Sequence, residues 1–557
     1  MKSFVPHGLR RLDNIRGDIY GGLTAAVVAL PLAIAFGVAS GAGPVAGLYG
    51  AIFVGLFAAL FGGTPSQVSG PTGPMTVVMT GILVQFTAAD PVNGAAMAFT
   101  VVMMGGFFLI LLGVFGLGRY ISLVPHPVIS GFMSGIGVII ILLQIGPLLG
   151  HKATGSPLES LRMLPEMIKD INPYSISLGF FTIIIVYLLP SRINRIIPAP
   201  LLALFAGTAA LLLFLPEGSV TTIGEIPSSI PMPDMPVFSL RMFPNMVKSA
   251  LILALLGSID SLLTSLVADN ITRTHHDSNR ELIGQGIGNI VAGLFGGLPG
   301  AGATMRTVVN IRAGGKTPIS GALHALVLLS VVLGAGKYAK YIPHVVLTGI
   351  LIKVGTDIID WSFFRRLHRT PRTAVLLMFT VLFITVFVDL ITSVAVGLVA
   401  ASLLLVQRMA DLQLKSIQAI TEPGDESPLC EEAMSILRAA KGRILLYHLS
   451  GPLSFGAAKD MAQRLNMIDD YEVMILDMSN VPTIDFTTSV SIEDMIRGAQ
   501  AEGHHVLLSG AQPVVRDILA RRGVFELLGK ENDFHRRLHA IRKAANLSGI
   551  EVGEASK

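Results

Sequence analysis

The feature that most constrains this chain is a succession of long apolar stretches that runs from Asp18 to about residue 410. Each stretch is about 20 residues long, which is the length a helix needs to cross the hydrocarbon core of a bilayer. Backbone polar groups in lipid must find their hydrogen-bond partners within the segment, so such stretches fold as helices. The sequence therefore predicts an all-α, polytopic membrane domain.

The composition agrees with this prediction and argues against several classes of protein. Only 14% of the residues are charged, against roughly 25% in soluble domains. This deficit argues against a soluble enzyme, a disordered chain and a nucleic-acid binder, and a net charge of +4 predicts no polyanionic partner. The single cysteine, Cys430, excludes a disulfide framework and a multi-cysteine metal site.

The composition changes after residue 410, where polar residues are followed by short β-like runs that alternate with amphipathic helices. Strands are expected at 443–449, 472–477 and 504–509, and helices at 487–501, 513–522 and 533–544. This alternation predicts a small α/β domain. The predicted parts are an N-terminal segment (1–17), a membrane domain (18–410), a linker (411–434), an α/β domain (435–545) and a tail (546–557).

Fourteen stretches are predicted to be membrane spans. They are 18–38, 45–61, 72–88, 93–116, 127–149, 173–190, 199–215, 246–269, 281–298, 303–314, 317–334, 343–360, 373–389 and 391–409. With the N-terminus inside, the inner segments before the α/β domain hold fifteen Lys and Arg residues and the outer segments six, although loop 150–172 holds three of those six. Both termini are therefore expected in the cytoplasm, with the protein in the plasma (inner) membrane.

Two of these stretches are unusual, because each follows a loop rich in Gly and Pro. The third follows residues 71–74 and the tenth follows residues 300–304, which are matching places in two halves of seven spans. An odd number of spans per half requires an inverted repeat, and paired interruptions of this kind mark the central site of a transporter. A helix that starts inside the membrane presents free N–H groups and a positive dipole end, which suit an anion. The alternative is that Gly and Pro only allow close packing or a kink.

Asp260 lies near the middle of the eighth predicted span. A carboxylate at that depth costs roughly 2.5–3.5 kcal/mol on insertion scales, so it is a functional candidate. Thr264 follows at i+4, which places its hydroxyl on the same helix face. Oxygen ligands of this kind suit Na⁺, and a carboxylate equally suits a proton. The alternative is a structural Asp that is satisfied by a neighbouring group.

Arg306 lies at the start of the tenth predicted span and would add a full positive charge to an anion site there. The alternative is that it snorkels to the membrane interface. Lys353 and Asp357 are four residues apart, so a local ion pair is expected. Asp389 is expected to be a cap or turn residue, and His126 and His324 are expected to be packing residues.

Three sequence motifs and the α/β domain resemble those of a known family. The segments Gly47–Tyr49, Ser69–Pro74 and Gly300–Thr307, followed by the α/β domain, resemble the SulP sulfate-permease family of anion transporters with a cytoplasmic STAS domain. The segments 15–41 and 281–286 are similar to its sodium-dependent bicarbonate-transporting members. The resemblance implies a 7+7 inverted repeat that is divided into core and gate bundles and works as an elevator in a homodimer.

The resemblance also assigns site residues, position by position. It implies a Na⁺ site at Asp260, Thr264, Gly302 and Thr304, and an anion site at Thr72, Gly73, Ala303, Thr304 and Arg306. Arg306 matches the arginine of many members, whereas a bicarbonate-transporting relative has glycine there. Leu32 follows Pro31 where many sulfate-transporting members have Gln, which favours a small or singly charged anion over sulfate.

In the STAS-like domain, Thr487 matches the phosphoacceptor position of related domains. Ser489 stands where those domains have Gly, so the favoured interpretation is a module that supports folding and dimerisation.

The expected function is secondary active transport of a small inorganic anion, with Na⁺-coupled bicarbonate uptake as the main prediction. An H⁺-coupled sulfate or dicarboxylate transporter and a passive anion channel remain open as alternatives. An enzyme is not expected, because the sequence holds no nucleophile–base pair, phosphate-binding loop or metal-ligand cluster. The expected partners are the anion, the coupling ion (Na⁺ or H⁺), membrane lipids and a second copy of the chain, with no cofactor and no nucleic acid.

Overall fold

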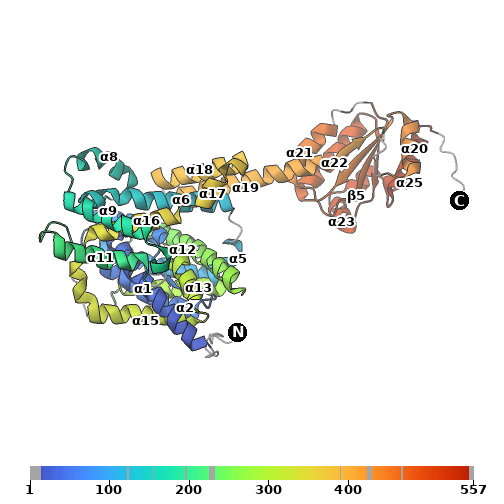
Figure 1. The fold of residues 1–557 in the computed structure, drawn as a ribbon. Helices are drawn as coiled ribbons and strands as arrows, with labels where there is room; N and C mark the ends of the chain where they lie inside the picture. Colours follow the sequence, from blue (N-terminus) through green and yellow to red (C-terminus); the bar gives the residue numbers. More distant parts are fainter. Residues whose placement is uncertain are drawn as a thin grey trace. The chain divides into compact units, whose positions relative to one another are not determined.

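A computed structural model describes residues 14–121, 125–154, 156–194, 197–224, 232–388, 390–422, 429–465, 468 and 470–550. Contacts divide the chain into two compact units, residues 1–399 and 400–557. The first unit is helical and the second is built on a β-sheet (Figure 1). The predicted fold class, an all-α membrane domain followed by a small α/β domain, is confirmed.

The first half of the membrane unit runs from α1 to α11. Its helices and strand are α1 (Ile15–Ser40), α2 (Pro44–Phe61), β1 (Ser69–Gly70), α3 (Gly73–Ala89), α4 (Gly94–Val114), α5 (Gly118–Ile121), α6 (His126–Leu143), α7 (Ile145–Leu149), α8 (Pro157–Met167), α9 (Pro173–Leu188), α10 (Ser191–Asn194) and α11 (Ala199–Phe214). Pro occupies the first turn of many of these helices, where its missing N–H costs no hydrogen bond.

The second half runs from α12 to α19. Its helices and strand are α12 (Phe243–Thr272), α13 (Ser278–Leu294), β2 (Ala301–Gly302), α14 (Thr304–Arg312), α15 (Pro318–Ala335), the 3₁₀ turn η2 (Gly336–Tyr341), α16 (His344–Ile358), α17 (Trp361–Arg365), the 3₁₀ turn η3 (Leu367–Arg369), α18 (Arg372–Phe387) and α19 (Leu390–Lys415).

Each of the fourteen predicted spans coincides with one of these helices, or with the pair α6 and α7. Among the described residues, six helices are long and apolar enough to span a bilayer, and five more are apolar but shorter. The tenth predicted span is the short α14, with nine residues. The number of spans itself stays a prediction.

The helices of the membrane unit pack into two groups. We call α1–α4 and α12–α15 the core bundle, and α6, α7, α9, α11, α16 and α18 the gate bundle. The core bundle therefore contains the first four spans of each predicted half. Within it α13 packs on α4 and α2 packs on α15, which are equivalent pairs in the two halves. This arrangement is the one that an internal repeat requires.

The C-terminal unit contains a five-stranded sheet with the order β3-β4-β5-β6-β7. The strands are β3 (Gln418–Ile420), β4 (Ile444–Ser450), β5 (Val473–Asn480), β6 (His505–Ser509) and β7 (Asp533–Phe534). The helices are α20 (Glu431–Ala440), α21 (Phe455–Leu465), α22 (Phe486–Ala501), α23 (Pro513–Arg521), α24 (Val524–Leu528) and α25 (Arg537–Leu547), with a 3₁₀ turn η4 (Lys530–Asn532). Alternate residues of β4 and β5 enter two separate apolar clusters, so the sheet is buried on both faces (Figure 1).

The structure corrects two expectations for this unit. The helix predicted from residue 533 begins at Arg537, because Asp533 and Phe534 pair with β6 as a short strand. The predicted linker contains β3, which pairs antiparallel with β4. Strands of two or three residues are too short to show an alternating pattern, so the sequence carried no signal for either.

Candidate functional site

The candidate site is organised by two short strands inside the core bundle, β1 and β2, which pair with each other. Ser69 pairs with Gly302 and Gly70 with Ala301, in antiparallel register. Shortly after β1 the chain enters α3, and shortly after β2 it enters α14. The pairing of β1 with β2 therefore holds the N-termini of α3 and α14 close to each other. It also joins the two Gly- and Pro-rich segments that the sequence analysis identified.

Asp260 is the buried carboxylate of this site. It lies on α12 with an exposed fraction of 8%. The hydroxyl of Thr72 donates to Asp260 Oδ2 at 2.8 Å. Thr72 is the N-cap residue of α3, so the carboxylate is fixed against the start of the first interrupted helix.

Thr264 lies one turn further along α12 and reaches the second interrupted helix. Its hydroxyl donates to the Gly302 carbonyl at 3.0 Å and lies 2.8 Å from Thr304 Oγ1. The sequence placed Thr264 on the face of Asp260, but the hydroxyl that bonds the carboxylate is that of Thr72. The result is a set of oxygen atoms from α12, β2 and the starts of α3 and α14.

Ser261 and Gln67, which the sequence analysis missed, complete this arrangement. Ser261 Oγ accepts a hydrogen bond from the Gly302 amide at 3.0 Å. A Cβ at position 302 would lie 2.4 Å from Gln67 Nε2, so Gly302 allows this close approach. Ser261 adjoins Asp260 in the sequence, but a serine in an apolar helix carries no further signal.

Glu281 is a second buried carboxylate, with an exposed fraction of 1%. It accepts hydrogen bonds from the amides of Gly63 and Thr64 at 2.9 Å each, and from Gln67 and Gln285 at 2.7 and 2.8 Å. These four donors satisfy the charge and hold the loop before β1. An acid next to an apolar helix was visible at this position in the sequence, but its partners were not.

Arg306 is 2% exposed and follows the start of α14 by two residues. Its Nη2 donates to the Pro71 carbonyl, next to the start of α3. Among the described residues, its Nη1 has no hydrogen-bond partner. Gly70 lies against this guanidinium, since a Cβ there would come within 2.7 Å of Nη1 and its φ of +150° favours glycine. The guanidinium is therefore buried between the two interrupted helices and does not snorkel to an interface.

The other polar residues from the sequence analysis lie apart from this cluster. The Lys353–Asp357 ion pair is confirmed on α16. The side chain of His126 is 73% exposed and lies 3.9 Å from Asp360, whereas His324 is fully buried in α15. Asp389 lies outside the described residues.

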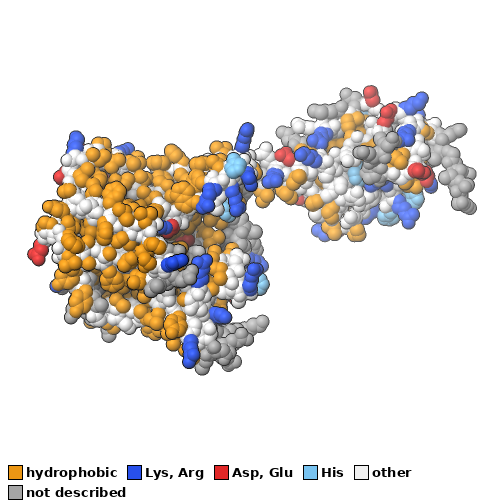
Figure 2. Space-filling view, in the orientation of Figure 1, with side chains coloured by type: hydrophobic (Ala, Val, Ile, Leu, Met, Phe, Trp, Pro, Cys, Tyr) orange, Lys and Arg blue, Asp and Glu red, His pale blue; other side chains and the backbone are white. Residues whose placement is uncertain are grey.

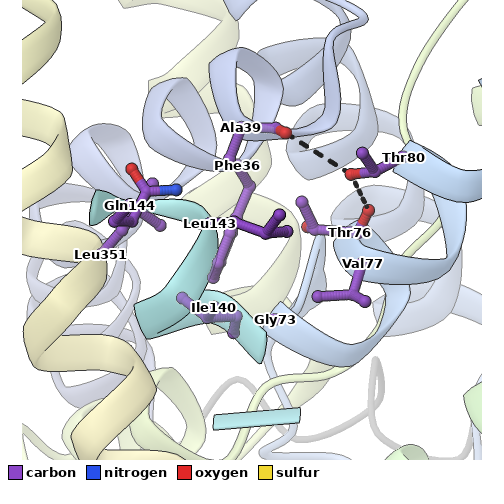
Figure 3. A pocket seen from close by; sticks show the side chains of 10 residues that line it. All are labelled: Phe36, Ala39, Gly73, Thr76, Val77, Thr80, Ile140, Leu143, Gln144 and Leu351. Carbon is purple, nitrogen blue, oxygen red and sulfur yellow. Dashed lines mark hydrogen bonds between the residues drawn. The ribbon is translucent and has the colours of Figure 1, made fainter. Parts of the chain in front are cut away.

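Gly73, the first residue of α3, faces the gate bundle. A Cβ there would come within 2.7 Å of Ile358 and 2.8 Å of Ile140, so the two bundles are in close contact at this point. The neighbouring cavity has a volume of about 10 Å³ and is lined by residues of α1, α3, α6 and α16, with Gln144 at the start of α7 (Figure 3). That space holds one water molecule at most, so this cavity does not accommodate a polyatomic anion.

The described residues contain no group of three or more His, Cys, Asp and Glu side chains that could hold a metal ion. The groups that the site does contain favour two other kinds of ligand, an anion and a hard monovalent cation. Two helix N-termini and a guanidinium favour an anion, and a carboxylate with hydroxyl and carbonyl oxygens favours a hard cation.

In the C-terminal unit, Thr487 is exposed in the first turn of α22. The Asp485 carboxylate caps this helix by accepting from the Thr488 amide at 2.7 Å, and it also accepts from the Phe455 amide at 2.7 Å. The hydroxyl at position 487 is thus presented at the surface on an ordered helix start.

A second polar group of this unit is centred on Asp477, at the carboxyl end of β5. Its carboxylate accepts hydrogen bonds from His448 at 2.6 Å and from Ser479, and it forms an ion pair with Arg537 at 2.6 Å. Burial acts to raise the pKa of Asp477, but the hydrogen bonds from His448 and Ser479 and the charge of Arg537 together lower that pKa below its usual value. This carboxylate is therefore charged in the folded domain at neutral pH.

Comparison with known proteins agrees with this geometry. The chain matches the sulfate permease family over residues 15–381 and the STAS domain over residues 436–540. It is 46% identical over 544 residues to "Bicarbonate transporter BicA" of Synechocystis sp., covering 98% of this chain and 96% of the relative. It is 47% identical over 536 residues to the protein of the same name from Picosynechococcus sp., covering 95% of each chain.

Solved structures give the same result. The transmembrane domain of a cyanobacterial bicarbonate transporter BicA matches with a TM-score of 0.66 and 50% identity, covering 69% of this chain and 98% of that one. The murine anion transporter Slc26a9 matches with a TM-score of 0.81 and 20% identity over 96% of this chain and 92% of its own, which shows a shared fold. These relatives are transporters, so the prediction that the chain is not an enzyme is confirmed. The chain, a polytopic membrane protein with a C-terminal STAS domain, therefore belongs to the sulfate permease family of anion transporters.

Proposed function

We propose that this protein takes up bicarbonate together with Na⁺ by secondary active transport. The observation that carries the proposal is the buried Asp260 carboxylate, which the Thr72 hydroxyl ties to the start of α3 at 2.8 Å. Thr72 thereby connects the negative charge of Asp260, which suits a cation, to the N-terminus of α3, which suits an anion. Binding of either ion alters the electrostatic environment of the other, and this is the requirement for coupling.

The cation would bind as a substrate at Asp260, with oxygens from Thr264, Gly302 and Thr304 nearby. Thr264 Oγ1 already bonds the Gly302 carbonyl and lies next to Thr304 Oγ1. These are hard oxygen ligands that arise from three separate elements. A Na⁺ bound there would neutralise a carboxylate that is otherwise costly to bury.

The anion would bind between the starts of α3 and α14, at Thr72, Gly73, Ala303 and Thr304, with Arg306 behind them. Each helix N-terminus contributes the equivalent of roughly half a positive charge. The buried Arg306 guanidinium adds a full charge beside Pro71. Such a site recognises the charge and size of the anion.

Two lines of argument favour bicarbonate over sulfate. Two relatives named for bicarbonate transport are 46% and 47% identical over nearly the whole chain. "Sulfate transporter 4.1, chloroplastic" of Arabidopsis thaliana is 25% identical over 476 residues, covering 80% of this chain and 68% of the relative. Leu32 after Pro31 agrees with the first group.

We further propose that the core bundle moves against the gate bundle as an elevator. The contacts of Gly73 with Ile140 and Ile358 would have to separate for an anion to leave on that side. We also propose a homodimer in the plasma membrane with both termini in the cytoplasm, and the domain bounds predicted from the sequence, except that the predicted linker contains β3. The proposed role of the STAS domain is to support folding and dimerisation, and a regulatory role of Thr487 is the alternative.

The test is uptake by proteoliposomes of labelled bicarbonate, sulfate and fumarate, each measured with and without a Na⁺ gradient. The expected result is bicarbonate uptake that requires Na⁺, with little uptake of the other two anions. Uptake that follows a pH gradient and ignores Na⁺ would instead assign a proton to Asp260. Anion flux with no coupled ion would indicate a passive channel.

A further inference from the structure

We propose that α17, η3 and the exposed face of α18 form a binding site for one anionic glycerophospholipid, with its phosphate at the arginines and an acyl chain along α18. This segment is the connection between the two gate helices α16 and α18. It lies outside the ion site described above, and the proposal does not depend on which anion is transported.

The first observation is an unbalanced positive charge. Arg365, Arg366, Arg369 and Arg372 lie within eight residues, and all four are exposed. Among the described residues, none of their guanidinium groups forms an ion pair with a carboxylate. Figure 2 shows basic side chains gathered over α17. Four uncompensated guanidinium groups form a strong site for phosphate oxygens.

The nearest acidic residue in the sequence, Asp360, is already engaged. Its Oδ1 accepts from the Phe363 amide at 3.1 Å and from Ser362 Oγ at 2.6 Å, so it caps α17. Its Oδ2 lies 3.9 Å from His126. The arginines are therefore free to bind an anion from outside the protein, since no carboxylate of the described residues balances their charge.

The second observation is an aromatic group at the same level. Trp361, the single tryptophan of the chain, is 50% exposed, and its indole N–H donates to the Thr356 carbonyl at 2.7 Å. Its ring lies 6.0 Å from that of Phe364, which lies 6.0 Å from that of Phe379 on α18. Trp at the headgroup level is typical of the membrane interface. The ring series thus leads from the arginines to the apolar surface of α18.

The third observation is the exposed stripe on α18. Leu376, Phe379, Phe383 and Phe387 are exposed by 70%, 40%, 59% and 41%. Their spacing from Arg372 is +4, +7, +11 and +15, which keeps all five on one face of the helix. The opposite face packs against α6. A guanidinium therefore stands at the head of an exposed apolar stripe.

The length of the stripe fits an acyl chain. Fifteen residues from Arg372 to Phe387 span about 22 Å at 1.5 Å per residue. One leaflet contributes roughly 15 Å of hydrocarbon, so the stripe reaches through the whole leaflet. A free phosphate ion would use the arginines and leave the stripe without a function.

A second copy of the chain fits this surface less well. A two-fold symmetric contact places the same patch on both partners, which would set four arginines against four arginines. The charge therefore favours an anionic lipid as the occupant.

The test uses the full-length protein and native mass spectrometry in detergent. The probes are dioleoyl phosphatidylglycerol, dioleoyl phosphatidylcholine with identical chains, and glycerol 3-phosphate as a chain-free headgroup. The wild-type protein is expected to retain phosphatidylglycerol at least tenfold better than phosphatidylcholine. Equal retention of the two lipids, or displacement of the lipid by an equal concentration of glycerol 3-phosphate, would overturn the proposal.

Matched variants assign the preference to this surface. The variant R365Q/R366Q/R369Q/R372Q should lose the preference for phosphatidylglycerol, since each basic residue contributes roughly fivefold. The control K152Q/R162Q/K169Q/R241Q removes four exposed charges elsewhere and should keep the preference within twofold. An equal loss in both variants would show that only net charge matters.

The stripe is tested separately. Phe383→Ala should lower phosphatidylglycerol occupancy about threefold, whereas Phe214→Ala, at an 82% exposed position on α11, should leave it unchanged. If the two variants behave alike, the acyl chain does not lie along α18.

Discussion

At the scale of single residues, the candidate site is built from side chains that are far apart in the sequence. Asp260 was identifiable because a carboxylate near the middle of a membrane span is costly and is therefore a functional candidate by default. Its partner Thr72 is 188 residues away. Threonines are common in membrane helices, so nothing in the sequence marked this one as the donor apart from the family resemblance.

Asp260→Asn should abolish Na⁺-dependent uptake while the protein still folds, because the amide removes a charge that the cation needs and that burial disfavours. Uptake of labelled bicarbonate into proteoliposomes across a Na⁺ gradient measures this effect. Asp170→Asn changes an exposed carboxylate of the same unit and serves as the control. Na⁺-dependent uptake at the wild-type rate in Asp260→Asn would rule out the cation site.

Thr72→Val should weaken Na⁺ binding by about tenfold or more, because a hydrogen bond to a charged group contributes roughly 1.5–3 kcal/mol. The half-saturating Na⁺ concentration for uptake reports this change. Thr87→Val is the matched control, since the Thr87 hydroxyl bonds only to the backbone of its own helix. A Thr72→Val protein with unchanged Na⁺ dependence would show that the Thr72–Asp260 bond has no part in coupling.

At the scale of elements, the sequence located the helices well and the short strands poorly. Each predicted span is helical because apolar stretches of this length have no other stable form in lipid. The pairing of β1 with β2 joins residues more than 200 positions apart, and each strand has two residues. Local patterns do not contain such pairings, although the Gly and Pro residues correctly marked where they occur.

Arg306→Ala tests how the two interrupted helices share the charge of the anion. The two helix N-termini together offset roughly one negative charge, and Arg306 adds another beside Pro71. We expect a mild loss of bicarbonate transport and a severe loss of any sulfate transport, measured as the concentration dependence of uptake for each anion. Equal losses for both would leave Arg306 as an anchor for the loop before α3.

At the scale of the whole molecule, the chain is divided into two compact units. The residues of the candidate ion site all lie in the first unit, within residues 1–399. The second unit is stabilised by its own apolar clusters on both faces of its sheet. The buried polar group around Asp477 leads to a separate prediction, which concerns the stability of this unit at low pH.

The STAS domain should lose stability in acid. Hydrogen bonds and the Arg537 charge hold the pKa of Asp477 below its usual value in the folded state, so the unfolded state binds the proton more readily. The stabilisation is present above the unfolded pKa of about 3.9 and is lost as the pH falls through the lower folded pKa. Calorimetry on the full-length protein should show the unfolding temperature of this domain falling below about pH 4, and Asp477→Asn should weaken that dependence.

Truncation at Lys415 tests whether the division between the units is functional. This end point removes the whole sheet, including β3, which lies in the segment predicted to be a linker. Because Thr72, Asp260 and Thr304 all remain, the truncated protein should bind bicarbonate with an affinity within about threefold of the full chain, as measured by isothermal titration calorimetry. If the C-terminal domain supports folding or dimerisation as proposed, the folded yield or the transport rate of the truncated protein should fall. If a monodisperse truncated protein binds no anion, then the STAS domain contributes to the anion site and the assignment of that site to the membrane unit is wrong.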